Sequence, residues 1–126
     1  MNQIADAFSD SQTVAHYTEG PPRMVPGYAG MQRMATLLLA ERIAEAGQVL
    51  VLGAGGGLEL KVFAEAHANW TFHGVDPSAP MLKLAERVLG PLASRVTLKE
   101  GTVDDAALGP FDGATCLLTM HFLPLE

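Results

Sequence analysis

The fold is decided by one stretch, Val49-Leu50-Val51-Leu52-Gly53-Ala54-Gly55-Gly56-Gly57. Its first four residues are apolar without polar alternation, which is typical of a strand buried on both faces of a parallel sheet. Its glycines lack a Cβ atom, so a ligand can lie directly against the main chain there. Residues 58 to about 67 then favour a helix whose backbone N–H groups and positive end face that ligand. We therefore expect a nucleotide-binding unit at the carboxyl edge of a sheet.

Downstream of this unit, strands alternate with helices. Ser78 can cap a helix that has Pro80 in its first turn and that ends at Gly90 and Pro91. Such alternation predicts an α/β fold with a doubly wound parallel sheet and right-handed crossovers, in which the apolar first strand is central. The later strands are expected at residues 70–75, ending on Asp76, at 96–99 and at 114–120.

Upstream of the unit, apolar residues recur at helical spacing. Met31, Met34 and Leu38 lead to Ile43, and Gly47 is placed to cap the end of this helix. Residues 1–20 are polar and weakly patterned, and their expected anchors are Phe8, Val14 and Tyr17. We therefore divide the chain into an N-terminal cap segment, residues 1–30, and a cofactor-binding domain, residues 31–126.

Composition excludes several classes of function. The 126 residues are 48% hydrophobic and 17% charged, with a formal net charge of −6. No direct DNA binding is expected, because a grip on a phosphate backbone needs clustered Lys and Arg. A single cysteine, Cys116, rules out an intrachain disulfide, and the N-terminus does not resemble a signal peptide, so a cytoplasmic location is expected. No apolar stretch is long enough to cross a bilayer, and no interaction with a membrane is expected.

Asp76 supports a bound nucleotide. It stands about 20 residues after the glycine cluster, at the end of the second expected strand, where a carboxylate usually accepts hydrogen bonds from two ribose hydroxyls. The alternative is that the glycines serve only the backbone angles of a tight turn between strand and helix. That alternative does not explain the acid at position 76. The dinucleotide pattern G-x-G-x-x-G wants a third small residue where this chain has Leu58. An NAD-dependent oxidoreductase is therefore the less favoured alternative.

The spacing Gly53-x-Gly55-x-Gly57 resembles the first motif of the class I (Rossmann-type) S-adenosylmethionine (SAM)-dependent methyltransferases. Three further motifs resemble that family in order: residues 74–82, residues 96–104, and residues 111–124. Residues 23–28, after Tyr17, are similar to small methyltransferases of the type 11/12 group, and distantly to the carboxy-SAM synthases of tRNA modification. The resemblance implies a Rossmann-like fold and transfer of a methyl group from SAM.

The resemblance also implies roles for individual residues. The turn residues Gly53, Ala54, Gly55 and Gly57 would pack against the methionine and ribose parts of SAM. Asp76 would bind the ribose diol, Pro77 and Met81 would flank the adenine, Thr102 and Val103 would meet its edge, and Thr119 would face the methionine end. Tyr17, Arg23 and Tyr28 would close over the cofactor, with Arg23 pairing with its carboxylate. The methyl acceptor, a small molecule or RNA, and the catalytic residues stay unassigned, and no metal site is expected because the histidines lack ligand neighbours.

The chain departs from the family pattern at two positions and stops early. Val51 stands where the family usually has an acid that helps to hold the methionine ammonium group, and Thr102 replaces an acid of the adenine loop. These departures keep open a SAM-binding subunit without catalysis, or pseudo-enzyme, as an alternative. The family's sheet continues beyond a fourth strand, whereas this sequence ends there. We therefore expect either self-association through the uncharged edge of residues 114–120 or a truncated fold.

Overall fold

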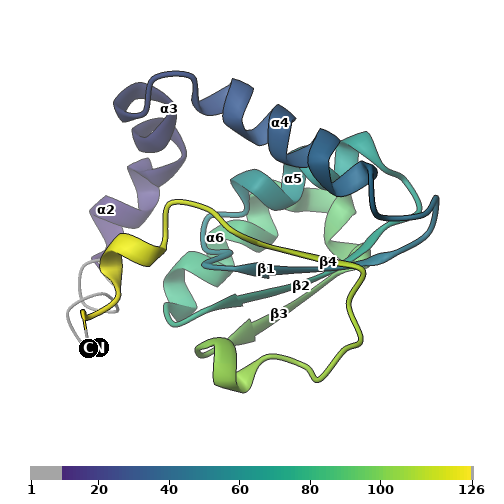
Figure 1. Ribbon diagram of the computed structural model, residues 1–126. Coiled ribbons are helices and arrows are strands. Elements are labelled where there is room, and N and C mark those ends of the chain that lie inside the picture. Colours follow the sequence, from purple (N-terminus) through teal and green to yellow (C-terminus); the bar gives the residue numbers. More distant parts are fainter. Residues whose placement is uncertain (1–9, 126) are drawn as a thin grey trace.

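Helices lie over one face of a parallel sheet in the computed structural model, which describes residues 10–125 (Figure 1). The sheet has four strands in the order β3-β2-β1-β4, all paired in parallel. The strands are β1 (Gln48–Leu52), β2 (Thr71–Asp76), β3 (Val96–Glu100) and β4 (Gly113–Cys116). The predicted parallel α/β sheet of the Rossmann-like methyltransferase type is confirmed, and β1 lies inside it as expected.

The position of β1 explains its lack of polar alternation. Val49 and Val51 are fully buried on the face that the helices cover, whereas Leu50 and Leu52 are half-buried on the opposite face. Leu50 pairs in register with His73 of β2 and with Ala114 of β4, so main-chain partners stand on both sides. An apolar residue is therefore favoured at each position from 49 to 52.

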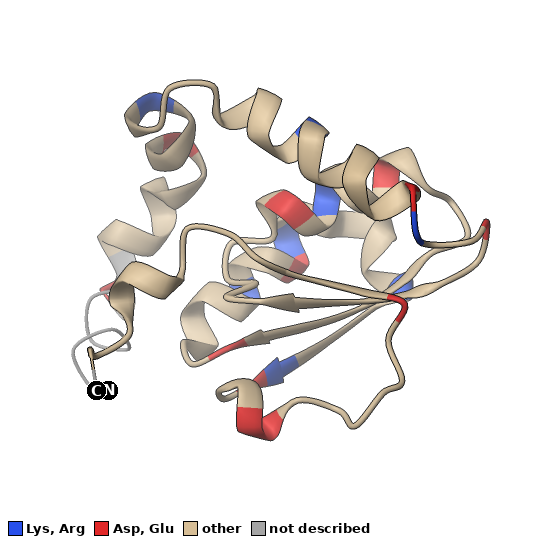
Figure 2. Ribbon diagram, in the orientation of Figure 1, with Lys and Arg blue, Asp and Glu red and all other residues tan. Residues whose placement is uncertain are grey.

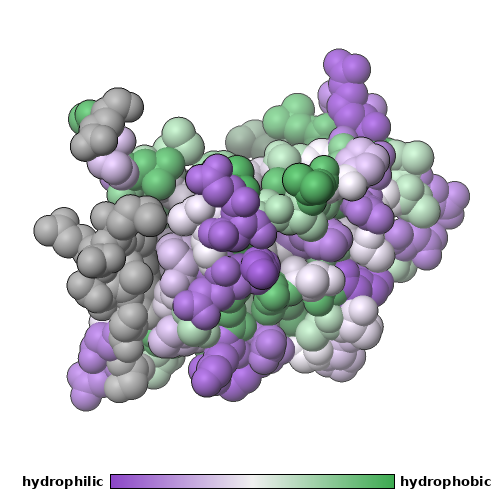
Figure 3. Space-filling view, turned by 90° about the horizontal axis from the view of Figure 1, so that it is seen from below, coloured by the Kyte–Doolittle hydropathy of each residue, from purple (hydrophilic) through white to green (hydrophobic). Residues whose placement is uncertain are grey.

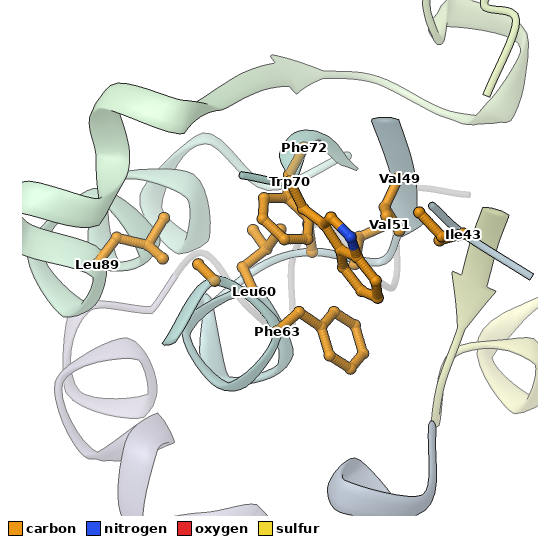
Figure 4. Packing of buried hydrophobic residues seen from close by; sticks show 10 residues of the cluster. Ile43, Val49, Val51, Leu60, Phe63, Trp70, Phe72 and Leu89 are labelled. Carbon is orange, nitrogen blue, oxygen red and sulfur yellow. The ribbon is translucent and has the colours of Figure 1, made fainter. Parts of the chain in front are cut away.

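The core lies between the sheet and the helices α4 (Tyr28–Ala40), α5 (Leu58–Ala66) and α6 (Ala79–Leu89). Phe63 of α5 packs with Trp70 and Phe72, and all three are at most 1% exposed (Figure 4). Ser78 caps α6 as predicted, since its Oγ accepts a hydrogen bond from the Met81 N–H.

The opposite face of the sheet is not covered by any helix among residues 10–125 (Figure 1). Figure 3 views the molecule from below and shows hydrophobic surface between polar side chains. A doubly wound sheet carries helices on both faces, whereas the helices of the described residues cover one face.

Helix α4 differs from the prediction in its bounds and in its buried face. It begins at Tyr28 and ends at Ala40, before the Gly47 predicted as its cap. Met34 and Leu38 are more than 60% exposed, whereas Gln32 and Thr36 are buried. Ile43, which extends the apolar pattern in the sequence, is buried, but it belongs to the turn after the helix and not to the helix itself.

The N-terminal segment packs beside α6. It comprises α2 (Ser11–His16), the 3₁₀ turn η1 (Tyr17–Glu19) and α3 (Gly20–Met24). Val14 is an anchor as predicted, and it packs with Met81 and Leu84. Phe8 and the rest of residues 1–9 lie outside the described residues. The expected boundary at residue 30 falls inside α4.

The chain leaves the sheet earlier than predicted after β4. The strand was expected to run to residue 120 but ends at Cys116. Leu118 then has a φ of 53°, a left-handed conformation that side chains other than glycine rarely adopt. This turn directs residues 117–123, including the 3₁₀ turn η4 (Met120–Phe122), along the carboxyl edge of the sheet. Within residues 10–125, none of the helices combines the length and hydrophobicity that crossing a bilayer requires.

Candidate cofactor-binding site

A cavity of about 690 Å³ opens at the carboxyl ends of all four strands. A volume of this size suits a small-molecule cofactor, and this edge is where open α/β sheets bind their ligands. Segments that follow β1, β2, β3 and β4 line it, together with the N-terminal segment and the start of α4 and α5. The cavity brings together most of the predicted site residues: Tyr17, Tyr28, Gly53, Gly55, Asp76, Pro77, Met81, Thr102, Val103 and Thr119.

Three predicted site residues lie outside the cavity lining. Arg23 is exposed on α3, and its guanidinium pairs with the Glu19 carboxylate over 3.7 Å. Ala54 is fully buried, and its N–H donates to the Val75 carbonyl over 3.0 Å. Gly57 packs against α6, where an added Cβ would lie 2.9 Å from the Ala85 Cα atom. Ala54 and Gly57 therefore act on the side of the turn that faces away from the cavity, where they fix its distance from β2 and α6.

Asp76 is held rigidly at the end of β2. Its Oδ2 accepts a hydrogen bond from the Gly55 N–H and its Oδ1 accepts one from the Ser78 N–H, each over 2.9 Å. Burial raises the pKa of Asp76, and these two backbone donors act in the opposite direction. Each carboxylate oxygen retains a lone pair, so the group can still accept hydrogen bonds from a ligand in the cavity.

The glycine turn does not offer its N–H groups to a ligand as the sequence suggested. The N–H groups of Ala54, Gly55, Gly56 and Gly57 donate to the Val75 carbonyl, the Asp76 carboxylate, the Met81 carbonyl and the Ala54 carbonyl, respectively. Four consecutive donors are therefore used within the protein. A pyrophosphate binds through free backbone donors, and these four N–H groups of the turn are not free for it.

The glycines instead allow segments far apart in the sequence to meet at the cavity. A Cβ atom on Gly53 would overlap the Thr119 side chain, and one on Gly56 would overlap the Tyr17 ring. Both glycines also have positive φ. Thr119 after β4 and Tyr17 of the N-terminal segment thus approach the turn closely, as the roles implied by the resemblance require.

The cavity is lined by four carboxylates and by no Lys or Arg among the described residues. Asp76 was predicted, whereas the other three acids were missed by the sequence interpretation. Figure 2 shows acidic residues at the carboxyl ends of β2 and β3 and in the 3₁₀ turn η3 (Val103–Asp105). The missed acids are Glu59, Glu100 and Asp105.

Asp105 supplies an acid in the loop where Thr102 stands in place of the family's acid. The Thr102 N–H and Oγ1 donate to Asp105 Oδ2 over 2.8 and 3.3 Å. A carboxylate is therefore present beside Thr102 and Val103 at the expected adenine edge. Thr102 and Asp105 are three residues apart, which is the spacing of a capping box. This spacing could have indicated the contact between them from the sequence.

Glu59 projects from the first turn of α5 and is only 7% exposed. Burial raises the pKa of Glu59 to about 7, and the Asp76 charge adds to this, while its own backbone N–H acts in the opposite direction. Glu59 precedes the buried Phe63 by four residues, so helical spacing alone places it on the inward face of α5.

Comparison with known proteins shows the family of the chain. The family model described as a methyltransferase domain matches residues 50–126, so the chain belongs to the methyltransferase domain family. This confirms the family that the four motifs indicated, and it removes the support for an NAD-dependent oxidoreductase. No curated protein matches the chain significantly in sequence.

Several solved structures share the fold. DesVI from Streptomyces venezuelae is 27% identical over 70% of this chain and 35% of its own, with a TM-score of 0.54. PKMT2 from Rickettsia typhi is 32% identical over 57% of this chain and 15% of its own, with a TM-score of 0.51. A second structure of PKMT2 contains AdoHcy. The sarcosine dimethylglycine methyltransferase-like protein of Galdieria sulphuraria, at 19% identity over 60% of this chain and 29% of its own, has the same fold with a TM-score of 0.54. The chain thus spans about a third or less of these proteins.

Proposed function

We propose that this chain forms the cofactor-binding part of a SAM-dependent methyltransferase that transfers a methyl group to a small-molecule or RNA acceptor. Membership of the methyltransferase domain family and the cavity at the carboxyl edge support this proposal. The AdoHcy bound to PKMT2, which is the demethylated product of SAM, supports the same choice of cofactor.

The charge of the cavity is the observation that carries the proposal. SAM has a positively charged sulfonium and an ammonium group, whereas NAD carries a negatively charged pyrophosphate. The lining contributes Glu59, Asp76, Glu100 and Asp105 without a basic side chain, and the N–H groups of the glycine turn are engaged. Opposite charges attract strongly in a partly buried site, so this cavity favours SAM over NAD.

The residues of the lining divide the work of binding. The Asp76 carboxylate is aligned to accept hydrogen bonds from the ribose hydroxyls, a charge-assisted contact. Met81 and Pro77 offer apolar surface to the adenine, with Thr102 and Val103 at its edge. In this proposal, Arg23 does not hold the methionine carboxylate, because its guanidinium pairs with Glu19 on the surface.

The chemistry of methyl transfer demands little acid–base machinery from the protein. SAM supplies a methyl group on a good leaving group when it is bound, so the protein mainly aligns the acceptor and excludes water. Tyr17 and Tyr28 stand at the N-terminal side of the cavity, where they would limit access of water. His121 is exposed and lies outside the cavity lining, with its ring centroid 4.0 Å from that of Phe122, so we assign it no role in proton transfer.

Transfer of labelled methyl groups tests the function. SAM labelled at its methyl group is incubated with the protein and with RNA or small-molecule fractions, and the Asp76→Ala variant serves as the control. Label transferred by the wild-type protein above this control supports the proposal. Binding of SAM without transfer to any fraction would instead favour the non-catalytic SAM-binding subunit.

A further inference from the structure

Glu59 is a buried acid without a cationic partner among residues 10–125. Among the carboxylates of the described cavity lining, only that of Glu59 is buried, with 7% exposure. Ion pairs among residues 10–125 join Arg23 to Glu19 and Lys61 to Glu65, and none involves Glu59. Lys61 and Glu65 are both exposed on the outer side of α5.

The groups around Glu59 do not compensate its charge. Tyr17 of η1, Tyr28 of α4 and Asp76 of β2 are the titratable groups that interact with it electrostatically. None of the three carries a positive charge, and Asp76 is itself an acid. Burying a charge without a partner costs several kcal/mol, so Glu59 does not stabilise the fold by an ion pair. A buried acid with a perturbed environment in a cavity is a candidate for ligand binding.

The strand cannot supply the acid that the family resemblance leads one to expect. Val51 occupies that position, and its side chain is 1% exposed in the core between the sheet and the helices. Glu59 enters the cavity from the other end of the same turn, at the start of α5. We infer that Glu59, rather than a residue of β1, binds the ammonium group of the methionine part of SAM; this inference rests on the function proposed above.

The pH dependence of binding follows from this role. Burial raises the pKa of Glu59 to about 7, so roughly half of the ligand-free protein carries a neutral Glu59 at neutral pH. An ammonium group favours the ionised carboxylate. Affinity for SAM should therefore fall as the pH drops below about 7, and the fall should be smaller in the Glu59→Gln variant.

Three ligands separate the contact with the ammonium group from other contacts. SAM has both the sulfonium and the ammonium group, S-adenosylhomocysteine has the ammonium group alone, and 5′-methylthioadenosine has neither. Each is titrated calorimetrically into the wild-type protein, Glu59→Gln, and the exposed control Glu65→Gln on the same helix. Thermal unfolding without ligand verifies that each variant is folded.

We expect Glu59→Gln to weaken binding of SAM and of S-adenosylhomocysteine at least about tenfold, the usual effect of losing a charged hydrogen-bond partner. Binding of 5′-methylthioadenosine should be unchanged, and Glu65→Gln should bind all three ligands as the wild-type protein does. Equal weakening of all three ligands, weakening of SAM alone, or no weakening would each overturn the inference. If the wild-type protein binds none of the three, the proposed function itself fails, which is a distinct result.

Discussion

Gly55 and Asp76 are in direct contact at the carboxyl edge of the sheet. The Gly55 N–H donates to Asp76 Oδ2 over 2.9 Å, and a Cβ atom on Gly55 would lie 2.7 Å from that same oxygen. Gly55 is not among the glycines with positive φ, so glycine is required here for space and not for its backbone conformation. The turn after β1 and the acid at the end of β2 are therefore fixed to each other by a contact that a larger residue would disturb.

Replacing Gly55 should impair stability as well as binding. In Gly55→Ala, the new Cβ also meets the Met81 Cβ at 2.8 Å, so either α6 or Asp76 must shift. We expect the free energy of unfolding to fall by about 1–3 kcal/mol, as for other overpacked sites, and SAM affinity to fall as well. Denaturant unfolding and calorimetry measure the two effects. Gly30→Ala is the control, because nothing lies within 4 Å of its added Cβ, and its stability should be equal or higher. A Gly55→Ala variant that matches Gly30→Ala in both measurements would contradict this contact.

Asp76→Ala should weaken binding of S-adenosylhomocysteine by about 1.5–3 kcal/mol, because a charged hydrogen-bond partner of the ribose is lost. It should also lower stability, since the Gly55 and Ser78 N–H groups lose their acceptor. Glu65→Gln, which is exposed on α5 outside the cavity lining, keeps its size and should bind as the wild-type protein does. Calorimetric titration of both variants provides the comparison. Unchanged affinity in Asp76→Ala would remove Asp76 from the site.

Glu59 makes the stability of the ligand-free protein depend on pH. Burial raises its pKa in the folded protein to about 7 from an ordinary value of 4.5, so the folded protein holds more protons than the unfolded chain between these values. The stability contributed by this raised pKa is fully present below about pH 4.5 and is lost as the pH rises to about 7, a change on the order of 3 kcal/mol. Glu59→Gln should therefore gain stability relative to the wild-type protein across this interval, as measured by denaturant unfolding. A difference that stays constant between pH 4.5 and 8 would show that Glu59 is not buried in this way.

The outer edge of β4 should promote self-association. Among the described residues no strand pairs with that edge, and Ala114 is exposed on it without a charged neighbour in the strand. Light scattering should give an average mass that rises with protein concentration, and Ala114→Lys should reduce the rise, because a charge discourages edge pairing. The effect should be modest, since β4 spans four residues instead of the seven predicted. A monomer at every concentration would contradict this prediction.

Local signals in the sequence were sufficient for most of the fold. Residues close together in the sequence determine three of its features: the buried strand β1, the glycine turn and the Ser78 cap of α6. The bounds of α4 and the length of β4 could not be predicted, because tertiary contacts decide them. Ile43 is buried from a turn, and residues after Cys116 leave the sheet to line the cavity.

Sequence motifs predicted the site residues that belong to them, whereas the residues that tertiary packing brings to the site were missed. Asp76 and Thr119 follow strands directly, and parallel strands bring such residues to one edge. Helical spacing places Glu59 on the inward face of α5, but only the fold shows that its carboxylate enters the cavity. Arg23 was assigned to the cofactor from the resemblance of residues 23–28 and from its charge, but Glu19 lies one helical turn away and pairs with it.

Calorimetric titration of the wild-type protein with SAM and, separately, with NAD tests the central claim most directly. A cavity lined by four acids, beside a glycine turn whose N–H groups are already engaged, should bind SAM and leave NAD unbound at the same concentrations. SAM should also bind more tightly than the uncharged adenosine, since its positive groups face these acids. Binding of NAD without binding of SAM would contradict the account.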